Sequence, residues 1–326
     1  MDKFSHDIEE IIANLNSNLH DILKDIESQR VQILKKTRSF LIYFGVAFLG
    51  SLPVIVSIST NYVLFFLFVF FLIGIIVYYF WIKTAKDLLI DDFNTQVIPH
   101  VVKEFLSDAY FNHNTGISES EYIKSDIFRT ECDKYSGDSF VSGNFGETFL
   151  QFSNLHTKYE SGSGKSKRNE TIFKGIFLIA ESNKRFNNEV YIFPDSAERA
   201  FGGIGRWMQE KYGKYTRGEM VYLENPEFEK KFVVYATDPI EARYLLTMSM
   251  QEYFLQLSAH IGGRNIHASF IDGRLYLAIS GNFELFNFQI SMSLLDPKTL
   301  KYYCQNLGFI LSIIEILDLN TRIWGK

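Results

Sequence analysis

The most uneven feature of the sequence is a run of 44 residues, between Arg38 and Lys83, that contains no Asp, Glu, Lys, Arg or His. A membrane-spanning helix needs about 20 apolar residues, because the hydrocarbon core is about 30 Å thick and a helix rises about 1.5 Å per residue. The run is therefore long enough for two spans. Its polar midpoint, Ser59–Asn61, predicts transmembrane helices at about residues 39–58 and 62–82.

Basic residues flank both ends of this predicted transmembrane hairpin, and the short connection between the spans carries no charge. By the positive-inside rule, both ends of the chain then lie on the cytoplasmic side. For a bacterial source this predicts a multi-pass protein of the inner membrane, with its main domain in the cytoplasm. The lipid bilayer is therefore the first predicted partner. The flanking cations are Arg30, Lys35, Lys36, Arg38, Lys83 and Lys86.

Residues 2–38 contain neither Pro nor Gly, and their apolar residues recur at alternating spacings of four and three. Such spacing is typical of a coiled-coil seam, which would join a homo-oligomer or a helical protein partner through residues 8–33. The alternative is a helix that packs on the protein's own cytosolic domain. Both predict a helix. The seam residues are Ile8, Ile12, Leu15, Leu19, Ile22, Ile26 and Ile33.

After the predicted spans the chain returns to a mixed pattern. We expect a connecting helix that runs to about Phe111, and then a capping box at Ser118–Glu121 that opens a short helix. From Asp133 to Asp195 the alternation of Phe with Gly and polar residues predicts strands. Asp195 together with Glu198 marks the start of a further helix.

Turn and cap signals recur in the last third of the chain. Asp238-Pro239 predicts the start of a helix that runs to about Ala259, and Asp296-Pro297 predicts the start of the last helix. Asp272-Gly273 predicts a tight hairpin, because these residue types tolerate positive φ.

Runs of strands followed by helices favour an α+β domain over a doubly wound parallel sheet. The predicted fold is therefore an α+β cytosolic domain attached to a two-helix transmembrane hairpin, with an N-terminal amphipathic or coiled-coil helix. The predicted boundaries are 1–38 for the N-terminal helix, 39–82 for the hairpin, 83–134 for connecting helices and 135–326 for the α+β domain.

Composition and charge narrow the function classes. The chain is 47% hydrophobic and 22% charged, which is too apolar for a disordered protein. Its net charge of −5 argues against a dedicated nucleic-acid binder, which normally shows a basic face, so we expect no nucleic-acid partner. Two cysteines are too few for a disulfide framework or a cysteine-based metal site.

Six segments within residues 92–326 carry a resemblance to a known family: Tyr135–Asp138, Val141–Gly143, Phe173–Phe177, Asn225–Tyr235, Asp238–Leu246 and Leu319–Trp324. Together they resemble a bacterial membrane family catalogued as domain of unknown function 3137. That family often has Pro where this chain has Met248. The resemblance implies the membrane architecture, and it implies no activity, cofactor or catalytic residue.

Gly162–Ser166 imitates the end of a phosphate-binding P-loop. The full motif needs a Gly at the position of Tyr159, and a helix must follow so that its N-terminus faces the phosphate. Here the pattern at Thr171–Ala180 predicts a strand instead. We therefore interpret the loop as a polar hairpin connection.

No other motif supplies chemistry. Seven histidines are scattered without metal-ligand spacing. Cys304 lies on the apolar stripe of a predicted helix, and Cys132 has acidic neighbours that disfavour the thiolate. Gly202–Gly205 is interpreted as a turn rather than an anion-binding nest. We predict no catalytic residue, no metal and no cofactor.

One segment interleaves cations and aromatic rings within twelve residues. Such a segment suits contact with anionic headgroups, with its rings at the interface. The alternative is a surface helix and loop with Trp207 in the core. The segment consists of Arg206, Trp207, Lys211, Tyr212, Lys214, Tyr215 and Arg217.

These patterns predict a membrane-anchored adaptor or sensor, without enzymatic activity, that binds a protein, a lipid headgroup or a small ligand. The alternative is a membrane-tethered enzyme whose site in the α+β domain we do not recognise. A pocket with converging titratable groups would favour the enzyme. An exposed groove or sheet edge would favour the binding module.

Overall fold

The computed structural model describes residues 2–57, 60–162, 164–182, 186–195, 217–317 and 319. The chain divides into two compact units. The first unit contains residues 1–100 and 287–302, and the second contains residues 101–286 and 303–326. The domain boundaries predicted from the sequence stay a prediction.

The first unit is helical. A short π-helical turn, η1, interrupts its second long run of helix, where the backbone N–H of Thr84 donates to the carbonyl oxygen of Tyr79. Pro53 lies inside a helix, as the sequence pattern allows. The elements are α1 (Asp2–Asn18), α2 (His20–Ser57), α3 (Thr60–Tyr78), η1 (Tyr79–Lys83), α4 (Thr84–Gln96) and α5 (Ile98–Phe105), which continues into the second unit.

Helices α2 and α3 contact one another through aromatic rings and one glycine. The ring centroids of Phe44 and Phe70 are 4.8 Å apart, and those of Phe48 and Phe70 are 5.6 Å apart. A Cβ added at Gly74 would lie 2.3 Å from the Phe44 ring. The missing side chain at Gly74 therefore lets α2 approach α3 closely.

Among the described residues, one helix is long and apolar enough to cross a membrane. It runs from Tyr62 to Phe105, and only 6% of its most apolar stretch is buried. This agrees with the second predicted span. The first predicted span, residues 39–58, stays a prediction, because the side chains of residues 54–61 lie outside the described part of the chain.

An arginine and a glutamate on α2 hold the segment 287–302 within the first unit. Arg30 donates two hydrogen bonds to the Glu27 carboxylate, at 2.8 and 2.7 Å, and a third to the carbonyl oxygen of Ile290 at 2.7 Å. Glu27 also accepts from the hydroxyl of Ser293 and the N–H of Leu294, both at 3.0 Å. We call these five residues the clasp.

The second unit is built on a nine-stranded sheet in the order β1-β2-β3-β4-β9-β8-β5-β7-β6. All its neighbouring strands are antiparallel, so the predicted mixture of helices with a non-parallel sheet is confirmed. The strands are β1 (Ser107–Asn112), β2 (Lys134–Phe145), β3 (Thr148–Ser161), β4 (Arg168–Glu181), β5 (Val190–Pro194), β6 (Glu219–Val221), β7 (Phe232–Ala236), β8 (Ile266–Ile271) and β9 (Arg274–Ser280).

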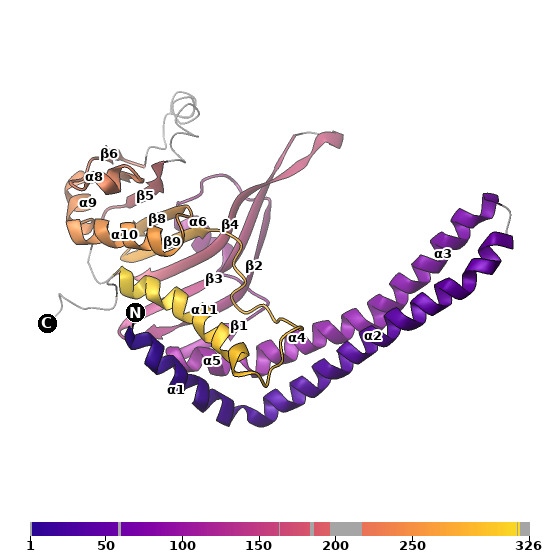
Figure 1. Cartoon of the computed structure of the whole chain (residues 1–326). Helices are drawn as coiled ribbons and strands as arrows, with labels where there is room; N and C mark the ends of the chain where they lie inside the picture. The colour runs from indigo at the N-terminus through magenta and orange to yellow at the C-terminus, as the bar shows by residue number, and fades with distance from the viewer. Residues whose placement is uncertain are drawn as a thin grey trace. The chain divides into compact units, whose positions relative to one another are not determined.

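The two faces of this sheet are covered differently. One face carries an aromatic cluster that includes Tyr122, Phe177, Tyr191 and Tyr276. Figure 1 shows α10 and the 303–316 part of α11 along the sheet on its other side. The second unit's helices are α6 (Glu119–Lys124), α8 (Pro226–Glu229), α9 (Pro239–Leu245), α10 (Met248–His260) and α11 (Pro297–Ile316), which begins in the first unit.

Several local predictions are confirmed. Asp272 and Gly273 have φ values of 50° and 73° and join β8 to β9, as a tight hairpin requires. The Asp238 side chain accepts from the N–H of Ile240 at 2.8 Å and caps α9. Ser118 caps α6 by accepting from the N–H of Glu121.

Two predicted helices end earlier than expected. The connecting helix ends at Phe105 rather than about Phe111, because residues 107–112 pair with β2 as an edge strand. The helix that starts at Pro239 ends at Leu245, and Thr247 starts a new helix by accepting from the N–H of Met250. The first helix ends early because of strand pairing with a distant segment. The second ends early because a capping residue interrupts a continuous apolar pattern.

Candidate functional site

Arg217 lies at the centre of a polar cluster in the second unit. Its Nη2 donates to the carbonyl oxygens of Asp126 and Ile127 at 3.0 and 2.9 Å. Its guanidinium carbon is 4.7 Å from the ring centroid of Phe193 and 5.5 Å from that of Tyr191. Arg217 therefore joins the segment before β2 to the aromatic face of β5.

Gly218, the residue after Arg217, allows β6 and β7 to pair closely next to the cluster. Gly218 has φ of 86°, and a Cβ there would lie 1.8 Å from the carbonyl oxygen of Ala236 on β7. Any side chain would therefore push β6 away from β7.

Asp126 links the same segment to β5 through its side chain. It has φ of 50°, which is rare for a residue with a side chain. Its carboxylate accepts from Nε of Arg129 at 2.7 Å and from the hydroxyl of Tyr191 at 2.9 Å. The hydroxyl of Tyr191 also lies 2.8 Å from Glu189. Burial, reinforced by these two carboxylates, raises the pKa of Tyr191.

His267 on β8 completes the cluster. Its ring lies 5.1 Å from that of Phe128 and 6.1 Å from that of Phe193, measured between centroids. Burial, followed by the charge of Arg217, lowers the pKa of His267 to about 4. Its Nδ1 is buried without a hydrogen-bond partner in the part of the chain that the structure describes. The imidazole is therefore neutral near pH 7.

These pKa shifts limit what the cluster can do chemically. A general acid or base works best with a pKa near the working pH. The pKa of Tyr191 is raised and that of His267 is lowered, so neither exchanges a proton readily near neutrality. The arrangement instead suits the attachment of a crossing segment to the sheet.

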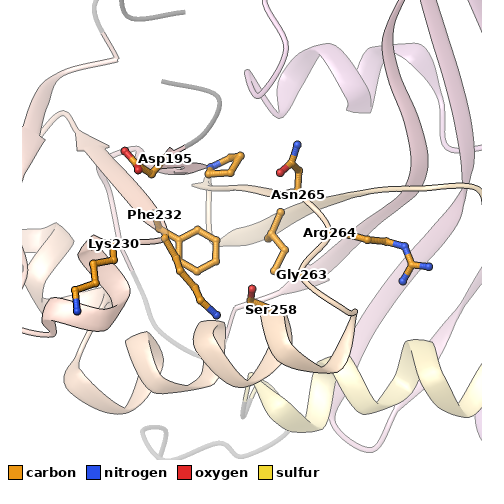
Figure 2. Close-up of a pocket in the computed structure, with 10 residues that line it drawn as sticks. Asp195, Lys230, Phe232, Ser258, Gly263, Arg264 and Asn265 are labelled. Carbon is orange, nitrogen blue, oxygen red and sulfur yellow. The ribbon is translucent and has the colours of Figure 1, made fainter. Parts of the chain in front are cut away.

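A pocket of about 460 Å³ lies at the end of α10, close to the ends of β5 and β7. Figure 2 shows Lys230 and Arg264 on opposite sides of it, each directed outward. Lys230 pairs with Glu227 at 2.6 Å, and Arg264 donates to the carbonyl oxygen of Ile261 at 2.7 Å. These two cations therefore do not converge on a common point.

Five exposed apolar residues lie in or close to the edge strand β6 and helix α9, which contact one another. Their side chains are between 39% and 78% exposed. Arg243 of α9 donates to the carbonyl oxygen of Tyr222 at 3.4 Å and connects the two elements. Residues 219–248 contain six acids and three bases. We call these five residues the edge patch: Met220, which pairs with Tyr235, and Tyr222, Ile240, Tyr244 and Met248.

The predicted family resemblance is tested by comparison. Residues 171–319 match the family described as protein of unknown function (DUF3137). The match confirms the predicted resemblance over this part of the chain. The DUF3137 segment contains Arg217, His267 and the whole edge patch, whereas Asp126 and Arg129 precede it.

Other comparisons add little. No curated protein matches the chain. A similar solved structure is that of the mycobacterial trehalose monomycolate transport factor A, TtfA, with 8% identity and a TM-score of 0.31. The likeness covers 63% of this chain and 88% of that one. At that level it says nothing about what this chain binds.

The predicted membrane-surface segment overlaps the DUF3137 segment and is described at one position. Arg217 lies in the polar cluster, with neutral acceptors and rings around it. The prediction for the rest of the segment stays open. Its other members, Arg206, Trp207, Lys211, Tyr212, Lys214 and Tyr215, lie outside the described residues.

The predicted helix-association seam lies in α1 and α2. Five of its members are no more than 7% exposed: Ile12, Leu15, Leu19, Ile26 and Ile33. Ile22 is half-buried, and the side chain of Ile8 lies outside the described part. Association with another helix and packing on the protein's own cytosolic domain both stay predictions.

The remaining sequence candidates are placed as follows. Ser161 pairs with Arg168, so a strand follows the P-loop mimic and the hairpin interpretation is confirmed. Burial raises the pKa of Cys304 to about 12, as expected for a core thiol. Among the described residues, no group of His, Cys, Asp or Glu could hold a metal ion. Gly202–Gly205 lies outside them.

Sequence reasoning missed the polar cluster and the edge patch. The only local signal for the cluster is the pair Arg217-Gly218, since a glycine after an isolated arginine hints at an unusual backbone. The only sequence signal for the edge patch is the pair Ile240 and Tyr244, whose four-residue spacing places them on one face of a short helix.

Proposed function

We propose that this chain is a non-enzymatic adaptor, anchored in a membrane by α3 and the second half of α2, that binds a protein segment through the edge patch. The observation that carries the proposal is the exposure of the apolar helix α3. Leu64 is 78% exposed and Phe65 is 67% exposed. In water such a surface would be strongly unfavourable, whereas in a bilayer it is the expected surface of a span.

The proposed anchor has two spans. Leu41 and Leu49 of α2 are also exposed, at 62% and 65%, over the residues that the sequence assigns to the first span. The contact of Phe44 with Gly74 supports a transmembrane hairpin, because small residues commonly mark helix contacts in membranes.

The proposed topology follows from charge. Cations flank the outer ends of both spans, so both chain ends and the main domain are assigned to the cytoplasmic side of a bacterial inner membrane.

The edge patch is the proposed binding surface, and its occupant is a protein segment that carries apolar and basic side chains. The apolar part follows from the exposed side chains of Tyr222 and Ile240. The basic part follows from charge complementarity, because the surrounding residues 219–248 carry three more acids than bases. The acidic residues around the patch and the headgroups of anionic lipids would repel one another, which argues against a membrane surface as the occupant.

Chemistry around the second unit supports binding rather than catalysis. The pKa values of Tyr191 and His267 are shifted away from neutrality, and Lys230 and Arg264 point outward from the pocket in Figure 2. No observation on the described residues favours a particular reaction.

The anchor is tested by extraction and labelling. Membranes that contain the full chain are washed with alkaline carbonate, and we expect the protein to stay in the pellet. A cysteine at Asn61 should react with an impermeant thiol reagent in whole cells, and a cysteine at Asp138 should not. Release by carbonate, or labelling of both sites, would overturn the proposed anchor or its topology.

The binding surface is tested with the full chain in nanodiscs of neutral lipid, with empty nanodiscs as the blank. The probes are two synthetic peptides of equal length, one alternating Lys with Leu and the other Glu with Leu. We expect the Lys-Leu peptide to bind more tightly, and the double variant Tyr222→Ser, Ile240→Ser to bind it at least several-fold more weakly. Ile123→Ser is the matched control, since Ile123 is 63% exposed on α6. Equal binding of both peptides would overturn the charge argument.

A further inference from the structure

We propose that the cytoplasmic end of the anchor is a binding site for anionic phospholipid headgroups. The inference rests on the proposed membrane anchor and names a lipid partner for it. The site is a collar of five cations on two neighbouring helices, with exposed aromatic rings at the same level. The cations are Lys35, Lys36 and Arg38 on α2, Lys83 at the end of η1, and Lys86 on α4.

The two helices place these cations at one depth. Phe40 of α2 contacts Tyr78 of α3, with ring centroids 6.3 Å apart, so these two residues mark a common level. Lys36 lies four residues before Phe40, and Lys83 lies five residues after Tyr78. At about 1.5 Å per residue, both lie roughly one helical turn on the cytoplasmic side of that level. The collar is therefore a belt around the anchor rather than a set of scattered charges.

Two lysines of the collar point back toward the aromatic rings. Nζ of Lys83 is 4.7 Å from the ring centroid of Tyr79, and Nζ of Lys86 is 5.8 Å from that of Tyr78. Side chains on a helix lean toward its N-terminus, which for this helix is the membrane side. The ammonium groups are thereby held at the depth where headgroup phosphates lie.

The collar is not neutralised by the protein. Arg30, the next cation on α2, is paired with Glu27. In the part of the chain that the structure describes, none of the five collar cations forms an ion pair with a carboxylate. Asp87 is the one acid between Glu27 and Leu88. A positive belt without internal counterions is satisfied by an external anion.

The aromatic residues identify the anion as a lipid headgroup rather than free phosphate. Trp81 is 74% exposed and Phe80 is 69% exposed, next to the cations. Successive side chains on a helix point about 100° apart, so these rings face different sides of the helix. Rings of this kind sit at membrane interfaces, and free phosphate would leave them without a role.

The test uses the full chain in nanodiscs of phosphatidylcholine with a minor fraction of phosphatidylglycerol. Trace spin-labelled lipid of either kind reports which headgroup prefers the protein boundary. We expect phosphatidylglycerol to be preferred. Each cation near a membrane surface contributes roughly fivefold in partitioning, so the neutral variant with Gln at all five collar positions should lose most of the preference.

Matched variants separate charge from fold. The variant Lys35→Arg, Lys36→Arg, Arg38→Lys, Lys83→Arg, Lys86→Arg keeps every charge and should keep the preference. Neutralising five cations of the second unit, Lys134, Lys158, Lys167, Arg168 and Lys230, should leave it unchanged. A wild-type protein that shows no preference for phosphatidylglycerol, or a neutral variant that keeps this preference, would contradict the proposed headgroup site.

Two further measurements separate a lipid site from a phosphate site, and the collar from the anchor. Inorganic phosphate is compared with chloride at equal ionic strength, and loss of the preference with phosphate alone would mean that the site takes free phosphate. Failure of the proposed anchor has a different signature, because the chain would then not enter nanodiscs at all. A chain that inserts but shows no lipid preference contradicts only the collar.

Discussion

Arg30 in the first unit and Arg217 in the second unit each fasten a distant segment of chain, and they do so with different partners. Arg30 binds the Glu27 carboxylate and the carbonyl oxygen of Ile290. Arg217 binds two carbonyl oxygens and lies over two aromatic rings. A guanidinium that is buried or half-buried can thus be stabilised either by an opposite charge or by neutral acceptors with ring faces.

The two environments move the pKa values of the two arginines in opposite directions. The hydrogen bond from Arg30 to Glu27 raises the pKa of Arg30, and the same pairing lowers the pKa of Glu27. Burial lowers the pKa of Arg217, and the nearby charge of Arg129 adds to this effect. The clasp of the first unit therefore depends on an ionised carboxylate, and the attachment made by Arg217 does not depend on one directly.

The largest effect is expected from Arg30→Met. The change leaves the carboxylate of Glu27 buried without its cation, which typically costs about 4 kcal/mol. Hydrogen exchange of the full chain in detergent should show lost protection at the amide of Leu294, with little change in the second unit. Lys24→Met, an exposed position on the same helix, is the control.

A second variant tests whether the charge itself is responsible. In Glu27→Leu, Arg30→Met no buried charge remains, so at least half of the lost protection should return. If the double variant is as unstable as Arg30→Met, the clasp acts through shape or backbone contacts rather than through charge.

Arg217→Leu should have the next largest effect. It leaves the carbonyl oxygens of Asp126 and Ile127 without a donor, at a cost of about 3 kcal/mol. Protection should fall at residues 125–127, measured in the same way. Arg264→Leu is matched, since Arg264 also lies over a ring and donates to one carbonyl but is exposed. An equal loss in both variants would mean that burial of Arg217 is unimportant.

Acid should separate the two attachments. The pKa of Glu27 is lowered on folding, so its contribution to stability is complete above the ordinary carboxyl value of 4.5 and is lost as the pH falls through the lowered value. We therefore expect protection of Leu294, corrected for the intrinsic exchange rate, to fall in that acidic range. Glu27→Gln should remove this pH dependence, and a dependence that survives the change would assign it to another group.

The smallest expected effect is the difference between two conservative changes. Arg30→Lys keeps a cation beside Glu27 but loses the hydrogen bonds that Nε, Nη1 and Nη2 of Arg30 make at the same time. In Arg217→Lys a single Nζ replaces Nη2, the one nitrogen that donates to both carbonyl oxygens. The first change should therefore cost more than the second, by about 1 kcal/mol. Thermal unfolding of the two variants in detergent gives the comparison, and the reverse order would contradict the assigned partners.

Local signals in the sequence predicted local structure well. Asp272-Gly273 and Asp238-Pro239 specify a turn and a cap through their own side chains and backbone preferences, and both are found as predicted. The distant hydrogen bonds of Arg30 and Arg217 could not be predicted from the sequence. Arg30 and Ile290 are 260 residues apart, and Arg217 and Asp126 are 91 apart. Nothing in the neighbourhood of either arginine encodes its distant acceptor, because a backbone carbonyl is the same at every position.

The edge patch illustrates a different limit. Ile240 and Tyr244 have the spacing of a core-facing helix, and the sequence alone cannot tell a buried stripe from an exposed one. Their exposure is decided by the position of α9 next to β6 at the end of the strand order, which depends on how all nine strands pair.

The clasp also sets an order of events during synthesis. Arg30 leaves the ribosome 260 residues before Ile290, its acceptor. At about 5–20 residues per second, translation of that interval takes roughly 13–50 s. During this time both predicted spans have already emerged, while the charged pair on α2 still lacks the segment that it fastens. A nascent chain halted before residue 287 would therefore carry both predicted spans and yet leave the first unit unfinished.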